Sequence, residues 1–322
     1  MAFITFDKNE LLPELFGEFN RHLNLIESKF SVSLTSRGNV LSILGKDEDI
    51  SKVKLILKEL YKDLKKGRHI GIDEVNAAIV MNNLTSSNIK SKEKIALDEY
   101  VIRTKKKNIV PSTNTQLEYI KLLFQKDIVF AEGPAGTGKT YIAVAAAVSA
   151  FLAKKVDRII LSRPAIEAGE KLGFLPGDLK EKVDPFLRPL YDALQDMLPS
   201  ENFIRYMELG EIEIAPLAFM RGRTLNNAFI ILDEAQNTTD AQMKMFLTRI
   251  GEGSRMVING DISQVDLPTG AKSGLIDAID TLKNIKEIGF IKFENKDIIR
   301  HSLTTKIINA YDNKRKKLKK NA

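Results

Sequence analysis

The amino-acid sequence predicts an α/β protein whose main domain holds a parallel sheet with helices on both faces. From residue 109 onward, short apolar runs alternate with helical segments, and such runs are typical of strands buried on both faces. Glycine-rich and acidic residues follow the ends of these runs, at the edge where α/β sheets bind ligands. Residues 1–68 show a different pattern of short strands and amphipathic helices, which predicts a small additional α/β domain.

The composition is that of a folded protein without cysteine chemistry. The 322 residues are 43% hydrophobic and 28% charged, and there is no cysteine, which excludes disulfides, thiolate zinc sites and cysteine nucleophiles. The three histidines, His22, His69 and His301, are far apart in the sequence and exclude a histidine-based metal centre. No apolar run is long enough for a membrane span, so we expect a cytoplasmic protein with no membrane partner.

The net charge of +7 is concentrated in two segments. Residues 312–322 contain six basic residues and one acidic residue, and residues 62–107 contain eleven basic and six acidic residues. Local basic segments of this kind attract a phosphate backbone, but a lysine-rich terminus is also a common solvated end. For the tail at residues 312–322 the sequence favours neither interpretation.

The elements predicted for residues 1–68 follow the order strand, helix, strand, strand, helix. Leu11, Leu15, Phe19 and Leu23 recur at four-residue spacing, which predicts one continuous helix. The predicted elements are strands at residues 4–6, 32–34 and 40–44, a helix over residues 7–30, and a helix that begins at Asp47 and ends at Gly67.

Residues 69–108 are predicted to form a connector between the two domains. The connector contains a short helix near residues 75–81, a polar stretch at residues 82–88 and a basic run at residues 103–107. The main domain is predicted over residues 109–311 and is followed by the basic tail. Its predicted strands lie at residues 128–131, 158–161, 211–215, 229–232, 256–258 and 288–293.

A complete phosphate-binding loop follows the first of these strands and directly precedes a helical segment. Its glycines let backbone N–H groups converge on phosphate oxygens at a helix N-terminus. Lys139 is expected to place its ammonium group against the β and γ phosphates of ATP, and the hydroxyl of Thr140 to ligate Mg²⁺. An ordinary glycine-rich turn is the alternative, which the flanking strand and helix disfavour. The nucleotide-binding residues of the loop are Gly133, Pro134, Ala135, Gly136, Thr137, Gly138, Lys139 and Thr140.

Asp233 and Glu234 follow the apolar strand predicted at residues 229–232. At that strand end Asp233 is expected to hold Mg²⁺ together with Thr140, while Glu234 polarises the water that attacks the γ phosphate. This pairing favours hydrolysis over transfer of the phosphate to a bound acceptor. Two acids in this place could instead be ordinary charges at a helix N-terminus, but the phosphate-binding loop in the same domain disfavours that interpretation.

Two glutamines complete the predicted nucleotide site. The spacing Gly-Asp-x-x-Gln at residues 260–264 resembles the γ-phosphate sensor of superfamily 1 helicases, which makes Gln264 the candidate sensor and places Asp261 in the outer shell of Mg²⁺. Gln116 lies seventeen residues before Gly133, where related helicases keep a glutamine that reads the adenine edge through N6 and N7. A polar loop and an exposed helix start are the respective alternatives.

Taken together, these motifs resemble those of the PhoH-like proteins, P-loop ATPases related to superfamily 1 helicases, over nearly the whole chain. The resemblance also rests on longer segments at residues 163–178, 220–225 and 247–251, and on Arg300 and His301. It implies a RecA-like domain that hydrolyses ATP with Mg²⁺ in RNA metabolism, with an endoribonuclease of ribosome maturation as a frequent partner. It also implies a homo-oligomer, in particular a hexamer.

The resemblance extends to the first 68 residues, which are similar to the divergent KH-like module of the family. A standard KH domain clamps a nucleic-acid backbone with a GXXG loop between two helices, and residues 7–30 contain no pair of glycines at that spacing. RNA binding and a packing or assembly role therefore both stay open for this domain. Arg37, predicted on a hairpin turn, is the first position to test for RNA contact.

The main domain has room for one RecA-like core only, since it spans about 200 residues. Superfamily 1 helicases form their ATP site between two such cores, so a neighbouring subunit is expected to supply an arginine to the γ phosphate. Arg300 is the first candidate, and Arg221, Arg223 and Arg249 are the others. An intramolecular salt bridge is the alternative role for Arg300.

The sequence therefore predicts an RNA-associated, helicase-like ATPase that depends on Mg²⁺. Its expected catalytic residues are Lys139, Asp233, Glu234, Gln264 and Arg300. A nucleotide-gated scaffold that recruits a ribonuclease is the alternative. A P-loop kinase for a small metabolite is less favoured, because a kinase has no use for Glu234 as a water activator or for Gln264 as a γ-phosphate sensor.

Overall fold

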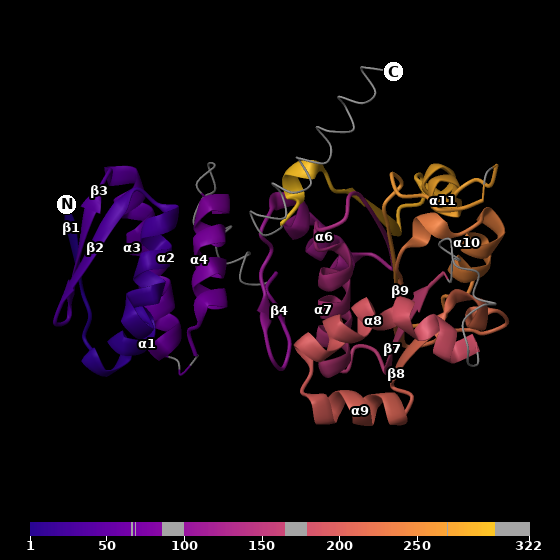
Figure 1. Cartoon of the computed structure of the whole chain (residues 1–322), viewed down its shortest axis with the longest axis horizontal. Coiled ribbons are helices and arrows are strands. Elements are labelled where there is room, and N and C mark those ends of the chain that lie inside the picture. Colours follow the sequence, from indigo (N-terminus) through magenta and orange to yellow (C-terminus); the bar gives the residue numbers. More distant parts are fainter. Residues whose placement is uncertain (66, 68, 86–99, 165–178, 269, 300–322) are drawn as a thin grey trace, which may run out of the picture. The chain divides into compact units, whose positions relative to one another are not determined.

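The structure is a computed structural model that describes residues 1–65, 67, 69–85, 100–164, 179–268 and 270–299 (Figure 1). The chain divides into two compact units. The N-terminal unit consists of Met1–Arg103 with Asn108–Leu117, and the second unit consists of Thr104–Lys107 with the chain from Glu118 onward.

The N-terminal unit contains a three-stranded antiparallel sheet with helices against one face (Figure 1). The central strand β3 (Val40–Gly45) pairs with β1 (Ala2–Thr5) on one side and with β2 (Val32–Arg37) on the other. Side chains alternate between the two faces of each strand, so one face of the sheet joins a hydrophobic core with α2 (Arg21–Lys29) and α3 (Asp47–Lys65).

The single helix predicted over residues 7–30 is wrong, because the segment breaks at Gly17. The observed elements are η1 (Asn9–Leu11), α1 (Leu12–Phe16), η2 (Glu18–Asn20) and α2. Gly17 has a left-handed φ of 72°, and Phe19 and Asn20 follow with φ of 52° and 60°. Leu15 and Leu23 are buried as predicted, whereas Phe19 is 99% exposed. The apolar residues thus keep their four-residue spacing although the helix is broken. In the sequence, only Gly17 indicates the break.

The turn from Gly17 to Asn20 lies between two helices, which is the place of the GXXG loop in a KH domain. The second glycine of that pattern is absent. Asn20 takes the left-handed conformation in its place, and asparagine tolerates this conformation because its short polar side chain can bond locally. The element order of this unit is therefore strand, helix, helix, strand, strand, helix, followed by one further helix.

That further helix, α4 (Ile72–Thr85), packs against α3 and is longer than the segment predicted near residues 75–81. Val75, Ala78 and Ile79 are buried in the same hydrophobic core as the side chains of α3. Beyond α4, strands β4 (Ile102–Arg103) and β5 (Asn108–Ile109) form a short antiparallel hairpin around the basic run.

The second unit is built on a six-stranded sheet in the order β11-β6-β10-β9-β7-β8 (Figure 1). All neighbouring strands are parallel, and each strand predicted from the sequence is present, which confirms the α/β fold class. The strands are β6 (Ile128–Glu132), β7 (Arg158–Arg163), β8 (Ile212–Pro216), β9 (Ala228–Leu232), β10 (Arg255–Gly260) and β11 (Ile288–Lys292).

Helices cover both faces of this sheet, as predicted. On one face, α10 (Asp240–Leu247) and α11 (Gly274–Leu282) pack on alternate residues of the strands, where Met243 and Leu275 meet Ile230 and Ile258. On the other face, α7 (Lys139–Leu152) contacts β7, β9 and β10, and α8 (Leu179–Met197) contacts β7 and β8. Two further helices are α6 (Asn114–Gln125) and α9 (Ser200–Glu208).

We expect Gly17→Ala to destabilise the N-terminal unit more than Gly38→Ala. Both glycines have a positive φ, 72° and 62°, and Gly17 combines it with a ψ of 164°, a region almost confined to glycine that costs another residue about 1–3 kcal/mol. At Gly17 an added Cβ would also lie 2.9 Å from the ring of His22, whereas nothing lies within 4 Å at Gly38. Such overpacking adds roughly 1–3 kcal/mol. Urea unfolding of the full chain measures both losses, and equal losses would contradict the packing argument.

Candidate nucleotide site

The glycine-rich loop connects the end of β6 to the start of α7. Gly133 and Gly136 have φ of 143° and 85°, a region that side-chain-bearing residues rarely adopt. A Cβ on Gly133 would lie 2.6 Å from the carbonyl oxygen of Phe293, which follows β11. The N–H of Gly133 donates to the carbonyl of Gly260, and the N–H of Ile299 donates to the carbonyl of Gly136. The ends of β10 and β11 therefore hold the loop in place.

Lys139 begins α7, and its side chain folds back under the loop. Its Nζ donates to the carbonyl oxygen of Gly133 at 2.6 Å and to that of Pro134 at 2.9 Å. Burial lowers the pKa of Lys139, while the nearby carboxylates of Asp261 and Asp233 act in the opposite direction. Phosphate oxygens are stronger acceptors than these neutral carbonyls, so the lysine can exchange its partners without leaving the loop.

Thr140 and Asp233, predicted as the magnesium ligands, are in direct contact. The Thr140 hydroxyl donates to Oδ1 of Asp233 at 2.6 Å. Asp233 is buried, which raises its pKa, and the hydrogen bond from Thr140 opposes this shift. A hydroxyl and a carboxylate oxygen are hard ligands that suit Mg²⁺, which usually keeps several waters and takes phosphate oxygens as its other ligands. The residues present therefore fit the ion.

Strand β10 separates β6, which leads to the loop, from β9, which leads to Asp233. Asn259 near the end of β10 is fully buried, and its Oδ1 accepts from the Tyr119 hydroxyl at 2.9 Å. Within the described part of the chain, Nδ2 of Asn259 has no partner. The Tyr119 hydroxyl also approaches the carbonyl oxygen of Lys139 at 3.5 Å. A neutral polar pair thus supports the start of α7 from the sheet.

Glu234 follows Asp233 in a left-handed backbone conformation, with a φ of 52°. Its Oε1 lies 3.2 Å from Nη2 of Arg163, the last residue of β7. Its Oε2 accepts from the side-chain amide of Gln236 at 2.6 Å. The predicted water activator therefore lies beside the predicted magnesium ligand, and both of its carboxylate oxygens are engaged.

Gln236 connects Glu234 to the loop that follows β10. Its side chain is 1% exposed and lies in the short helix η5 (Ala235–Asn237). Besides Glu234, its Nε2 donates to the carbonyl oxygen of Gln264 at 3.2 Å, and its Oε1 accepts from the N–H of Asp261 at 3.0 Å. The side-chain amide of Gln264 donates to Oδ2 of Asp261 at 2.6 Å. Gln264 and Asp261 thus join Glu234 in one hydrogen-bonded group.

Gln116 is buried in the first turn of α6, where it forms hydrogen bonds with the residues that precede the helix. Its Oε1 accepts from the N–H of Ser112 at 2.6 Å, and its own N–H donates to Oγ1 of Thr113. The oxygen that would accept from adenine N6 is therefore engaged by the backbone in this structure. Gln116 belongs to the N-terminal unit, so its role in reading adenine stays a prediction.

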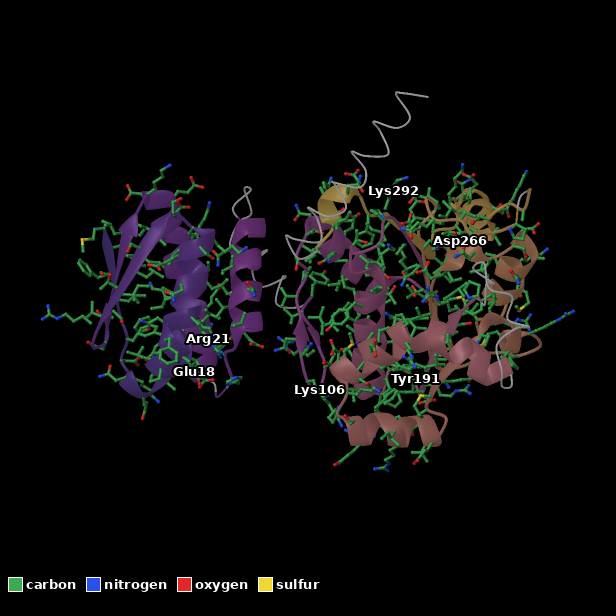
Figure 2. The ribbon with its side chains drawn as sticks, viewed as in Figure 1. Glu18, Arg21, Lys106, Tyr191, Asp266 and Lys292 are labelled. Carbon is green, nitrogen blue, oxygen red and sulfur yellow. The ribbon has the colours of Figure 1, made fainter. Side chains whose placement is uncertain are left out.

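Several expected residues lie outside the described residues, namely Arg300, His301, the tail at residues 312–322 and most of residues 163–178. The basic run at residues 103–107 is described. Lys107 forms an ion pair with Asp196 at 3.0 Å, and Lys106 donates to the carbonyl oxygen of Gln195 at 2.8 Å. Lys106, labelled in Figure 2, and Lys107 therefore both contact the C-terminal part of α8.

The other candidate arginines differ in their contacts. Arg223 forms a bidentate ion pair with Glu213, with N to O distances of 2.6 and 2.7 Å. Arg249 donates to the carbonyl oxygens of Met245 and Arg223. Arg221 is exposed. The guanidinium groups of Arg223 and Arg249 are thus engaged by groups of the same chain, and their role toward a γ phosphate stays a prediction.

The sequence did not predict Gln236, Asn259 or Tyr119 as parts of the site, and it placed Arg163 only within a longer segment. Asn259 could have been found, because a polar residue inside an otherwise apolar strand needs a buried partner. Gln236 stands three residues after Asp233, but its partners Asp261 and Gln264 are remote in the sequence. Only the fold brings them together.

We expect Asp233→Asn to raise the melting temperature of the ligand-free protein at neutral pH. Burial raises the pKa of Asp233 in the folded chain, so above that pKa the fold carries the cost of a buried charge. Asparagine removes the charge, and its amide oxygen can still accept from Thr140. The expected rise is about 2–4 °C for a gain of roughly 1 kcal/mol.

The rise in melting temperature should shrink as the pH falls. Below its raised pKa, Asp233 is protonated in the folded chain and carries no buried charge for asparagine to remove. Asp266→Asn, at an exposed position of the same unit, is the matched control (Figure 2). A lower melting temperature in Asp233→Asn than in this control would contradict the argument.

Comparison with known proteins gives a consistent result. The family model described as PhoH-like protein matches residues 108–312. A PhoH-like protein of Bacillus subtilis is 50% identical over 298 residues, which cover 92% of this chain and 93% of that protein. A PhoH-like protein of Mycobacterium tuberculosis is 46% identical over 302 residues, with coverage of 94% and 85%. Protein PhoH of Escherichia coli is 48% identical over 206 residues, with coverage of 63% and 58%.

Among solved structures, the UvsW helicase from bacteriophage T4 matches at 10% identity with a TM-score of 0.36, covering 79% of this chain and 95% of that chain. None of the helices that the structure describes has the length and apolar character needed to cross a bilayer. Because the family model covers the nucleotide site and two relatives are 50% and 46% identical over most of their length, the chain belongs to the PhoH-like protein family, a family of P-loop nucleotide-binding proteins.

Proposed function

We propose that the chain is a cytoplasmic ATPase that hydrolyses ATP with Mg²⁺ in RNA metabolism. The observation that carries this proposal is the convergence of Lys139, Thr140, Asp233 and Glu234 at one edge of the parallel sheet. A phosphate-binding loop, a pair of oxygen ligands for magnesium and a carboxylate beside them are the parts that hydrolysis of a nucleoside triphosphate requires.

Each residue has a distinct role in the proposed reaction. The backbone N–H groups of residues 133–138 and the ammonium group of Lys139 bind the phosphates at the N-terminus of α7. Thr140 and Asp233 would hold Mg²⁺, which when bound neutralises charge on the β and γ phosphates. Glu234 takes a proton from water as the oxygen of that water bonds to the γ phosphorus, and ADP leaves as the bond to the bridging oxygen breaks.

Association with RNA is supported by two features of the sequence. The first is the resemblance of residues 260–264 to the sensor of superfamily 1 helicases, and the second is the pair of basic segments at residues 62–107 and 312–322. The family resemblance adds an endoribonuclease of ribosome maturation as the proposed protein partner. In this proposal Gln264, linked to Glu234 through Gln236, reports the γ phosphate to the RNA-binding parts of the molecule.

A second candidate is a nucleotide-gated scaffold that recruits a ribonuclease and turns over slowly. The contacts of Glu234 favour it, because a carboxylate with both oxygens engaged is a poor proton acceptor for water. A kinase for a small metabolite is the least favoured function, since it would leave Glu234 and Gln264 without a purpose.

We expect phosphate release from ATP to depend on Mg²⁺ and to rise markedly when single-stranded poly(U) is added. Lys139→Ala should lose affinity for ATP, whereas Glu234→Gln should bind ATP and hydrolyse it roughly 10²–10⁴ times more slowly. Colorimetric phosphate release and the binding of a fluorescent ATP analogue measure the two effects separately.

Lys155→Ala and Glu208→Gln carry the same side-chain changes at exposed positions of the same unit and serve as controls. Slow release that poly(U) does not change would favour the scaffold, and phosphate on an added metabolite would favour the kinase. Hydrolysis by Glu234→Gln at the wild-type rate would show that Glu234 does not activate the water.

We further propose a ring-like homo-oligomer, in particular a hexamer, in which Arg300 of one subunit reaches the γ phosphate of the next. Mixing inactive Lys139→Ala with inactive Arg300→Ala should then restore part of the hydrolysis, because some interfaces combine an intact loop with an intact arginine. Light scattering and subunit-exchange controls accompany the assay. No recovery after demonstrated exchange would exclude Arg300 from acting in trans, and a fully active monomer would exclude the shared site.

A further inference from the structure

Glu234 is held by two groups that the nucleotide loop does not contain. The guanidinium of Arg163 lies 3.2 Å from Oε1, and the amide of Gln236 donates to Oε2 at 2.6 Å. Arg163 and Glu234 are both partly exposed, at 22% and 37% of their side-chain surface, so a dissolved ligand can reach the ion pair. A carboxylate in this arrangement has a cation on one oxygen and a hydrogen-bond donor on the other.

These contacts occupy both carboxylate oxygens of Glu234. To accept a proton from water, the carboxylate must offer an oxygen lone pair to that water, and the contacts with Arg163 and Gln236 compete for both oxygens. Gln236 is buried and hydrogen-bonded to the loop after β10, whereas Arg163 lies at a strand end and its side chain is partly exposed. Arg163 is therefore the contact that a ligand can remove.

The sheet order shows from which side such a ligand comes. β7, which ends at Arg163, is three strands away from β6, which leads to the phosphate-binding loop. Neighbouring strands are about 4.8 Å apart, so the two strand ends are separated by roughly 14 Å. Asp233 and Glu234 follow β9, which lies between them. Arg163 thus approaches Glu234 from the side opposite the loop, where a second anion rather than the nucleotide would meet it.

We propose that Arg163 is a positioning residue that restrains Glu234 until a phosphate of single-stranded RNA takes its guanidinium. A guanidinium binds phosphate oxygens through two parallel hydrogen bonds, a geometry that competes well with the 3.2 Å contact between Nη2 of Arg163 and Oε1 of Glu234. Release of Oε1 lets Glu234 turn to the attacking water. This inference rests on the proposed RNA-associated ATPase and explains how RNA would stimulate it.

The competition has a consequence that does not involve hydrolysis. If an RNA phosphate and Glu234 compete for Arg163, bound RNA weakens the ion pair between Arg163 and Glu234. Removal of Glu234 must then strengthen RNA binding by the same factor, because coupling between two binding events is reciprocal. Glu234→Ala should therefore bind poly(U) more tightly than the wild type. Arg163→Ala should bind it more weakly, and the double variant should behave as Arg163→Ala does.

The hydrolysis assay tests the restraint itself. Without RNA, Arg163→Ala should raise kcat about fivefold with little change in KM for ATP, which is the rate effect of removing a partly exposed ion pair worth about 1 kcal/mol. Addition of poly(U) should then give no further rise. Arg163→Lys keeps the charge but not the planar fork, so it should restore part of the restraint and part of the stimulation. Arg158→Ala, at the other end of β7, is the matched control.

The two sets of measurements separate this inference from the proposed function. A fall of kcat in Arg163→Ala, or equal poly(U) affinity of Glu234→Ala and the wild type, would overturn the restraint. Stimulation by poly(U) that persists in Arg163→Ala would overturn it as well. Absent phosphate release from every variant would overturn the proposed hydrolysis, while tighter poly(U) binding by Glu234→Ala and weaker binding by Arg163→Ala would still support the competition for Arg163.

Discussion

The hydrogen bond from Thr140 to Asp233 is the contact on which the geometry of the site depends. It joins the start of α7 to the end of β9, although β10 lies between β9 and the strand that leads to the loop. The loop must therefore pass over the end of β10, and the bond from the N–H of Gly133 to the carbonyl of Gly260 fixes this path. The bond also sets the positions of Lys139 and Glu234, because Lys139 directly precedes Thr140 and Glu234 directly follows Asp233 in the chain.

Neutral polar groups make this arrangement compatible with a buried site. Tyr119, Asn259 and Gln236 are uncharged, almost fully buried and hydrogen-bonded to the elements that carry the charges. Burying a neutral amide or hydroxyl costs far less than burying an ion. Burial disfavours the charged forms of the two ionisable residues, since it lowers the pKa of Lys139 and raises that of Asp233. Anionic phosphate at Lys139 and a divalent cation at Asp233 would each supply a charge of the opposite sign.

Much of the fold could be predicted from the sequence because its physical causes are local. All five residues of β9 are buried, so the strand appears in the sequence as an uninterrupted apolar run. The glycines of the loop are recognisable because other residues rarely adopt their backbone conformations. The break at Gly17 was missed because burial of Leu15 and Leu23 on two separate helices leaves the same spacing as burial on one. The contacts of Gln236 and Asn259 were missed because their partners are distant along the chain.

The order of strands in the main sheet also constrains how the protein is made. Both strands that pair with β6 come more than 100 residues later in the sequence, since β10 begins at Arg255 and β11 at Ile288. A ribosome delivers the chain from its N-terminus, so β6 and the loop it carries emerge long before either neighbour exists. The N-terminal sheet, by contrast, is complete once residue 45 has emerged, and α3 can cover it soon afterwards. During the interval between, the apolar strands β6 and β7 have no complete sheet to join, and such nascent segments are what chaperones bind.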